Sequence, residues 1–105
     1  MTVTHLAFVV AKPARGALLG RLLTELAAIA GTEPGCVDFA VHQSTDDPAL
    51  WFLYSNWQSA EALRRHLEAG EGARFAAAVA PLVEQGMDVH SFVRRGGSVP
   101  ALAAA

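Results

Sequence analysis

The spacing of hydrophobic residues changes several times along this chain, and the order of those changes restricts the folds open to it. Residues 3–10, 36–44, 50–57 and 87–93 alternate apolar and polar side chains or are rich in β-branched and aromatic residues, which predicts strands. In residues 14–30, 61–68 and 73–83 apolar side chains recur every three or four positions, which predicts helices. The predicted order is therefore β-α-β-β-α-β, with the second helical part broken at residues 69–72.

This order predicts an α+β fold, a ferredoxin-like βαββαβ domain whose antiparallel sheet carries its helices on one face. The chain of 105 residues has the length of one domain, to which we assign residues 1–95, and residues 96–105, rich in Gly, Pro and Ala, are predicted to form a flexible tail. Because 52% of the residues are hydrophobic, the other face of the sheet needs a cover as well. A second copy packed sheet against sheet would supply it, which predicts a homodimer.

Charge and motif content exclude several classes of protein. The net charge is −2 and no run of Lys or Arg exceeds two residues, so neither a nucleic-acid partner nor an anionic membrane is expected. Cys36 is the sole cysteine, which excludes an intrachain disulfide and a cysteine-based zinc site. The sequence has no metal-ligand spacing, phosphate loop or Gly-x-Ser-x-Gly motif. Without a leader-like start or an apolar stretch of about 20 residues, a soluble cytoplasmic protein is the expectation.

Four stretches of the chain, taken in order, have a more specific pattern. They are Lys12-Pro13; Glu33-Pro34-Gly35-Cys36; His42-Gln43-Ser44 with Asp46-Asp47-Pro48; and Tyr54-Ser55-Asn56-Trp57 leading to Ala62-Leu63 and His66-Leu67. This ordered set resembles the antibiotic biosynthesis monooxygenase family, and the resemblance extends to about Val83. It implies a dimeric α+β barrel and a monooxygenase that oxidises a phenolic, quinol or anthrone-type aromatic substrate with O2.

The resemblance also implies a mechanism without metal, flavin or any other cofactor. The protein binds the ring system in an apolar cavity between the helices and the sheet and favours its deprotonated form. The resulting carbanion or phenolate reduces dioxygen directly, and the radical pair collapses to a hydroperoxide and then to a quinone. The implied partners are therefore the aromatic small molecule and O2.

Three residues are the candidates for catalysis. His66 is the best acid/base group by its chemistry, because an imidazole titrates near neutrality. Trp57 occupies the family's tryptophan position at the end of the third predicted strand, and Asn56 carries an amide that can bind a substrate oxygen. Adjacent residues of a regular strand point to opposite faces, so Asn56 and Trp57 line one cavity only if a bulge intervenes.

Three further residues are candidates for binding the substrate: His42, Tyr54 and Phe75. His42 shares a strand face with Asp38 and Ala40, and that face is directed either to the cavity or to the dimer interface. Tyr54 can donate a phenolic hydrogen bond, although it shares a face with Phe52, which also suits packing. The two remaining histidines, at positions 5 and 90, are expected on outer strands with structural roles.

Two departures from the family pattern keep other functions open. Members often carry a second histidine five residues after the first, where this chain has Glu71. The haem-degrading branch needs an asparagine on the first strand, and residues 3–10 contain none. The alternatives are a non-catalytic dimeric module that binds a small molecule, and an isomerase or a haem-degrading enzyme on the same fold.

Overall fold

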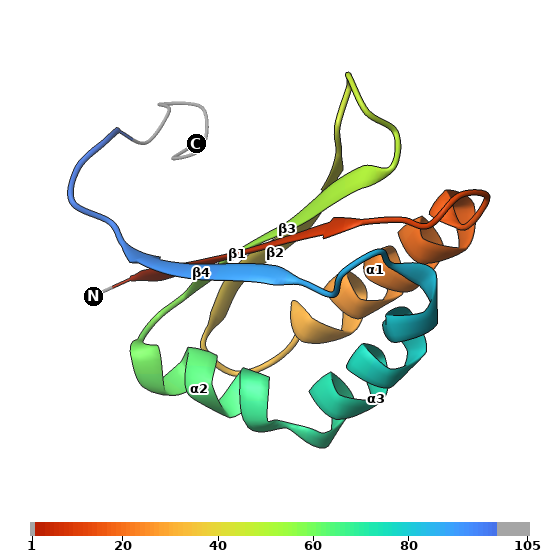
Figure 1. Ribbon diagram of the computed structural model, residues 1–105. Coiled ribbons are helices and arrows are strands. Elements are labelled where there is room, and N and C mark those ends of the chain that lie inside the picture. The colour runs from red at the N-terminus through yellow and green to blue at the C-terminus, as the bar shows by residue number, and fades with distance from the viewer. Residues whose placement is uncertain (1, 99–105) are drawn as a thin grey trace.

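Four antiparallel strands form one sheet in the order β2-β3-β1-β4, and three α-helices cover one of its faces (Figure 1). The computed structural model describes residues 2–98. The elements are β1 (Val3–Val10), α1 (Gly16–Ala30), β2 (Cys36–Gln43), β3 (Leu50–Trp57), α2 (Ala60–Glu68), α3 (Gly70–Val79), the 3-10 helix η1 (Ala80–Leu82) and β4 (Asp88–Val93). This is the ferredoxin-like α+β fold that the hydrophobic spacing predicts.

The register of the strands divides the sheet into two faces. Val3, His5, Ala7 and Val9 of β1 point toward the helices together with Leu53, Ser55 and Trp57 of β3, and we call this the helix-side face. The opposite surface, which we call the open face, carries Phe8, His42, Phe52, Tyr54, Asn56 and Phe92. Because β1 lies between β3 and β4, the expectation that His5 sits on an outer strand is wrong, whereas His90 is indeed on the edge strand β4.

The core forms where α1 and α3 pack on the helix-side face. Its fully buried side chains include Leu19 and Leu23 of α1, which recur at helical spacing and contact the sheet. Close approach of α1 to β3 requires Gly20, because a Cβ at this position would lie 2.5 Å from the ring of Trp51. The absence of a side chain at position 20 therefore sets the depth at which α1 packs on the sheet.

Two predicted helix boundaries are wrong for reasons of backbone geometry. The first helix begins at Gly16 instead of residue 14, because Ala14 has a positive φ of 65° that no helical residue adopts. The break between the later helices is confined to Ala69, whose backbone is extended with ψ 148°, and α3 starts at Gly70 instead of residue 73. Glycines weaken a helix, but Gly70 and Gly72 lie in the first turn of α3, directly after α2.

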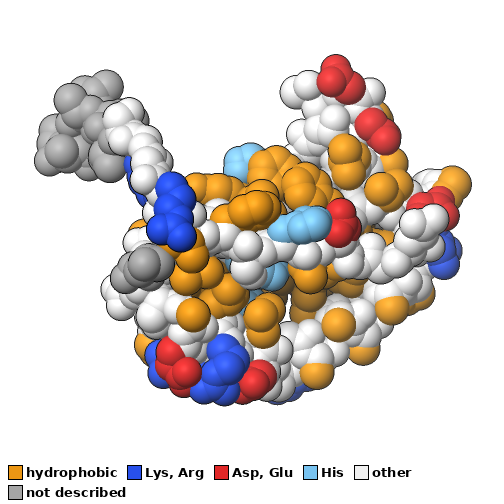
Figure 2. Space-filling model, turned by 60° about the vertical axis from the view of Figure 1, so that its left-hand side comes forward, with side chains coloured by type: hydrophobic (Ala, Val, Ile, Leu, Met, Phe, Trp, Pro, Cys, Tyr) orange, Lys and Arg blue, Asp and Glu red, His pale blue; other side chains and the backbone are white. Residues whose placement is uncertain are grey.

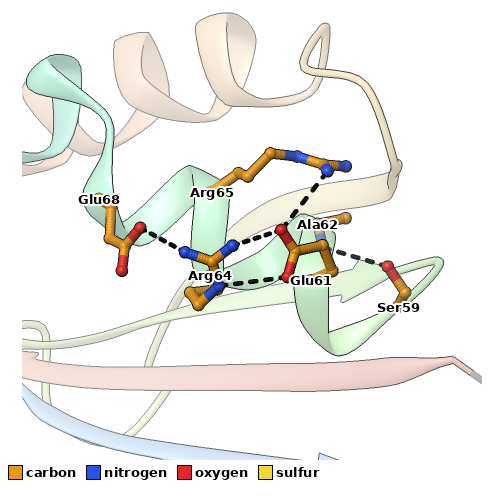
Figure 3. Close-up of polar contacts among 6 residues, drawn as sticks. All are labelled: Ser59, Glu61, Ala62, Arg64, Arg65 and Glu68. Atoms are coloured by element: carbon orange, nitrogen blue, oxygen red, sulfur yellow. Dashed lines mark hydrogen bonds and ion pairs between the residues drawn. The ribbon is translucent and has the colours of Figure 1, made fainter.

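The start of α2 is fixed by Ser59. The Ser59 hydroxyl accepts a hydrogen bond of 3.1 Å from the backbone N–H of Ala62 (Figure 3). On the exposed side of α2, Arg64 bridges Glu61 and Glu68, and its hydrogen bond to Glu61 lowers the pKa of that carboxyl group (Figure 3). These ion pairs are fully solvated and add little stability, so the cap and the buried face are what hold α2 in place.

Replacing Ser59 with alanine is expected to lower the free energy of unfolding by about 1 kcal/mol, because the first turn of α2 loses its side-chain acceptor. Urea unfolding followed by circular dichroism measures this change. Ser59→Asp keeps an acceptor and should retain most of the stability, and Gln58→Ala, one residue earlier on the surface, should be nearly neutral. An equal loss in Ser59→Ala and Gln58→Ala would contradict the capping role.

Of the tail predicted for residues 96–105, only residues 96–98 are described, and they belong to no helix or strand. The rest of that prediction lies outside the described residues.

Candidate active site

An apolar cavity of about 150 Å³ lies between the helix-side face of the sheet and the helices α1, α2 and α3. The residues around it come from all these layers, and they are His5, Ala7, Leu26, Phe39, Leu53, His66, Leu67, Gly72, Phe75, Ala76, Met87 and Val89. Only the two histidines carry a titratable group. A larger depression of about 630 Å³ borders the loop before β4, but no histidine is among the residues around it. The apolar cavity with its two histidines is therefore the candidate site.

His66 is held on α2 by a carboxylate from the turn before β2. Its Nδ1 lies 2.5 Å from Oε2 of Glu33, and both side chains are largely buried, with 12% and 23% of their surface exposed. A carboxylate accepts hydrogen bonds only, so Nδ1 carries the proton and donates it to Glu33. In the neutral ring this leaves Nε2 as a free base. Glu33 thus fixes the tautomer and the orientation of His66, as a carboxylate does in other acid/base sites.

Two aromatic rings complete the support of His66. The Trp57 ring stacks on the imidazole with centroids 4.7 Å apart, and Phe39 meets it edge-on at 5.8 Å. Trp57 is completely buried, and its indole N–H donates to the Ser55 hydroxyl at 3.0 Å. Trp57 therefore lies behind His66 and acts as its rigid backing.

His5 reaches the same cavity from the sheet. It is half-buried at the centre of β1, and burial, followed by the nearby charge of His66, lowers the pKa of His5 from its ordinary value of 6.5. The ring is therefore neutral around pH 7, and it can donate or accept a hydrogen bond inside the cavity.

The chain is expected to lose stability as the pH falls below about 6.5, because His5 takes up a proton in the unfolded state before it does so in the folded state. The contribution of His5 to the free energy of unfolding is complete above its pKa in the unfolded chain. It is lost as the pH falls through the lower pKa that His5 has in the folded chain. Urea midpoints measured at about pH 7.5 and about pH 5.5 should differ less in His5→Asn than in the parent chain. An identical acid-induced drop in both proteins would contradict the assignment.

His66 also faces the outside of the molecule. Glu33, Pro34, Ala62, Arg65 and His66 border a second depression of about 210 Å³ at the surface. The His66–Glu33 pair therefore lies between the apolar cavity and solvent. A proton accepted from a ligand in the cavity can leave through this pair without crossing the apolar interior.

The structure separates the residues that the sequence singles out. His66 and Phe75 line the cavity, and Trp57 supports His66 from below. His42, Tyr54 and Asn56 lie instead on the open face, across the sheet from the cavity. The rule that adjacent strand residues point in opposite directions thus separates Asn56 from Trp57. The sequence left open whether His42 faces the cavity or the dimer interface, and the structure places it on the open face, away from the helices.

Contacts on the open face account for the polar groups found there. The Asn56 amide oxygen accepts a hydrogen bond of 2.6 Å from the Thr4 hydroxyl, and its nitrogen donates to Asp38 at 2.8 Å. His42 stacks on Phe52 with a centroid distance of 4.6 Å. Strict alternation would place Val37 on the same face as Phe39. A bulge between Cys36 and Asp38 interrupts the start of β2, and Val37 is exposed instead.

Two other residues that the sequence singles out, Glu71 and Cys36, are not among the residues around the cavity. Glu71, at the position of the family's second histidine, lies in the first turn of α3 and pairs with Arg74 at 3.1 Å on the surface. Burial and then the carboxylates of Asp38 and Glu33 raise the pKa of the Cys36 thiol, which disfavours the reactive thiolate.

Sequence reasoning missed Glu33 and misjudged His5. A signal for His5 was present, because it is the one polar residue among the alternating positions 3, 5, 7 and 9 of the buried side of β1. Glu33 had no such signal, since its contact with His66 joins residues 33 positions apart. Across residues 2–98 no group of three or more His, Cys, Asp or Glu side chains could hold a metal ion. In the same part of the chain, no helix has both the length and the apolarity to cross a membrane.

Solved structures from several bacteria share this fold. The chain aligns with PA3566 of Pseudomonas aeruginosa at 27% identity and a TM-score of 0.82, covering 90% of this chain and 95% of that one. Rv0793 of Mycobacterium tuberculosis gives 20% identity and a TM-score of 0.86 over 94% and 100% of the two chains. SnoaB of Streptomyces nogalater, described as a cofactor-independent oxygenase, gives 21% identity and a TM-score of 0.82 over 91% and 95%. None of the curated proteins matches the chain in sequence.

The family described as antibiotic biosynthesis monooxygenase matches residues 2–81, which is most of the chain and includes the cavity's strand and helix walls as far as η1. With this match and the fold in agreement, the chain belongs to the antibiotic biosynthesis monooxygenase family.

Proposed function

We propose that this protein is a cofactor-independent monooxygenase that oxidises a small phenolic or quinol-type aromatic molecule with O2. The observation that carries the proposal is the His66–Glu33 pair, with its 2.5 Å contact, at the wall of an otherwise apolar cavity. Family membership and the fold shared with SnoaB, an oxygenase of this kind, support the same reaction class. His66 is the catalytic base, Glu33 and Trp57 position it, and Phe75 contacts the ring.

The reaction begins with proton transfer from the phenol oxygen to Nε2 of His66. Glu33 stabilises the imidazolium that forms, because its carboxylate faces the ring at Nδ1. The phenolate then gives one electron to O2, and the phenoxyl radical and superoxide combine to form a carbon–oxygen bond. The peroxide anion that results takes the proton back from His66, and the hydroperoxide so formed loses water to give a quinone. One phenol and one O2 thus yield one quinone and one water. The apolar walls keep bulk water away from the radical pair.

The size of the cavity favours a substrate with a single ring. An apolar cavity of about 150 Å³ accommodates one benzene ring, whereas sites for drug-sized ligands usually span about 300–1,000 Å³. The present cavity, at about 150 Å³, matches the smaller class. A tricyclic anthrone or a haem would require the walls to move apart, so a single-ring phenol or quinol is the preferred candidate within the proposed class.

Aerobic incubation with a panel of phenols and quinols tests the proposal, with oxygen uptake and quinone absorbance recorded together. Single-ring compounds should be oxidised faster than in the protein-free blank, and anthrone should react more slowly than the single-ring compounds. No enhancement for any member would refute the proposed activity and favour a non-catalytic binding module. A haem titration that shifts the Soret band would point instead to the haem-degrading alternative.

The open face supports a second part of the proposal, that two copies associate through it. Hydrophobic side chains and histidines gather over the sheet surface that the helices leave uncovered (Figure 2). Phe8 stacks on Phe52 with centroids 5.5 Å apart, and half of the Phe92 surface is exposed. Single chains rarely expose an apolar patch of this kind, and sheet-on-sheet packing is the usual way to cover one.

Replacing Phe8 with glutamate is expected to convert the dimer to monomer, because each copy would bring an unpaired charge into the centre of the interface. Light scattering coupled to size-exclusion chromatography measures the mass. Ile29→Glu is the matched control, since Ile29 of α1 is 52% exposed on the helical side, and it should leave the mass unchanged. A parent chain that elutes as a monomer, or a Phe8→Glu variant that stays dimeric, would contradict this interface.

A further inference from the structure

We propose that His5 is a second catalytic group of the cavity, which donates a hydrogen bond to the phenolate oxygen that forms when His66 accepts the proton. The inference rests on the proposed function for its reaction but makes a separate claim, that two imidazoles from different layers of the fold bind one oxygen. It begins from the location of the rings. His5 reaches the cavity from β1 and His66 from α2, and every other side chain on its walls is apolar.

The strand register places the two histidines at the same end of the cavity. His5 pairs with Ser55 across the β1–β3 ladder, and the next helix-side residue of β3 is Trp57, on whose ring His66 stacks. The cavity is otherwise lined by apolar residues, among them Leu26, Phe75 and Met87. A ligand with one polar end and one apolar ring fits this division, with its oxygen at the histidines and its ring against Phe75.

The His5 ring is free to bind a ligand. The influences on its pKa are burial and the charge of His66, and no hydrogen bond from residues 2–98 contributes to it. Its neighbours across the sheet on this face are Ser55 and Ser91, and the Ser55 hydroxyl already accepts a hydrogen bond from Trp57. The His5 nitrogens are not among the buried unpaired atoms of the described residues, so water or a ligand can reach them.

The charges around the cavity assign different roles to the two rings. Glu33 lies 2.5 Å from His66, whereas no carboxylate of residues 2–98 contributes to the pKa of His5, which burial and the charge of His66 lower. When His66 holds the proton, His5 therefore stays neutral and presents an N–H. A hydrogen bond from that N–H to the phenolate favours the charged oxygen over the neutral phenol.

Binding of 4-nitrophenol tests this role without any oxidation, because its absorbance distinguishes phenolate from phenol. The parent chain should bind the phenolate more tightly than the phenol. In His5→Phe this preference should fall by about 10- to 100-fold, the value of one hydrogen bond to a charged group. Binding of nitrobenzene, which has the ring without the oxygen, should change little, and His90→Phe on the edge strand should behave as the parent.

A donor at position 5 should rescue the preference. His5→Asn retains an N–H and should bind the phenolate better than His5→Leu, and this pair serves as the comparison if His5→Phe does not fold. An unchanged phenolate preference in His5→Phe or in His5→Leu would overturn the role of His5, even if the parent oxidises phenols. Loss of the preference in a chain that consumes no oxygen would instead support His5 and refute the monooxygenase. Failure of both ligands to bind the parent would refute the site itself.

Discussion

His66→Ala is expected to lower the rate of substrate oxidation by about 100- to 10,000-fold, the usual contribution of a positioned acid/base group. In the proposed mechanism His66 accepts the proton at Nε2, since its Nδ1 lies 2.5 Å from Oε2 of Glu33. Without it the phenol must ionise unaided in an apolar cavity, where a charged oxygen is strongly disfavoured. Steady-state oxygen uptake with the best substrate of the panel measures the change.

Two comparisons separate the chemistry of His66 from its packing. Glu33→Gln retains a polar side chain but removes the charge that stabilises the imidazolium, and we expect a smaller loss of about 10- to 100-fold. Substrates supplied as preformed phenolates should recover part of the activity of His66→Ala, because their proton is already absent. Activity in His66→Ala within a factor of about three of the parent would show that another group accepts the proton.

Trp57→Ala is expected to lower the free energy of unfolding by about 3–5 kcal/mol, the usual cost of removing a large buried aromatic side chain. Trp57 is completely buried in a cluster with Val3, Ala62 and Leu63, so it joins β3 and β1 to α2. This loss is a large part of the stability of a small domain, about 5–15 kcal/mol. Urea unfolding at a fixed protein concentration measures it, since dimerisation contributes to the apparent stability.

Matched variants test whether Trp57 acts through packing. Trp57→Phe keeps a ring against His66 and should retain most of the stability and activity, although Ser55 loses its hydrogen-bond donor. Ile29→Ala removes a hydrophobic side chain that is 52% exposed on α1, away from the open face, and its effect on the unfolding should be small. A Trp57→Phe variant that is stable but inactive would show that the indole itself takes part in the reaction.

Local sequence patterns account for most of the secondary structure. Period-two and period-four spacing, the Pro34-Gly35 turn and the Ser59 cap each act over a few residues, so they can be recognised without knowledge of the rest of the chain. The Pro34-Gly35 turn shows how strict such a signal can be. Gly35 has a φ of +86°, and a Cβ there would lie 2.5 Å from Ala62, so no other residue fits without strain.

The boundaries at Ala14 and Ala69 were not predicted, because an alanine in the sequence gives no sign of a non-helical backbone conformation. Alanine is the strongest helix former, yet Ala14 is left-handed and Ala69 is extended. The tertiary contacts of the strands and helices on either side impose these conformations. Residue propensities therefore predict where the helices and strands lie, whereas their first and last residues depend on the tertiary structure.

The sequence by itself determined the order of the elements, the family, and which side chains share a strand face. It separated Asn56 from Trp57 by alternation alone, and it singled out His66 by chemistry. It could not determine which face the helices cover, because that depends on pairing between segments far apart in the chain. Only the tertiary structure placed His42, Tyr54 and Asn56 on the open face. It also brought His5 and His66 to one cavity and Glu33 into contact with His66. The physical reason is that side chains alternate with the same period on both faces of a strand, so the sequence pattern does not tell the two faces apart. The packing of helices against one face decides which face lines the cavity.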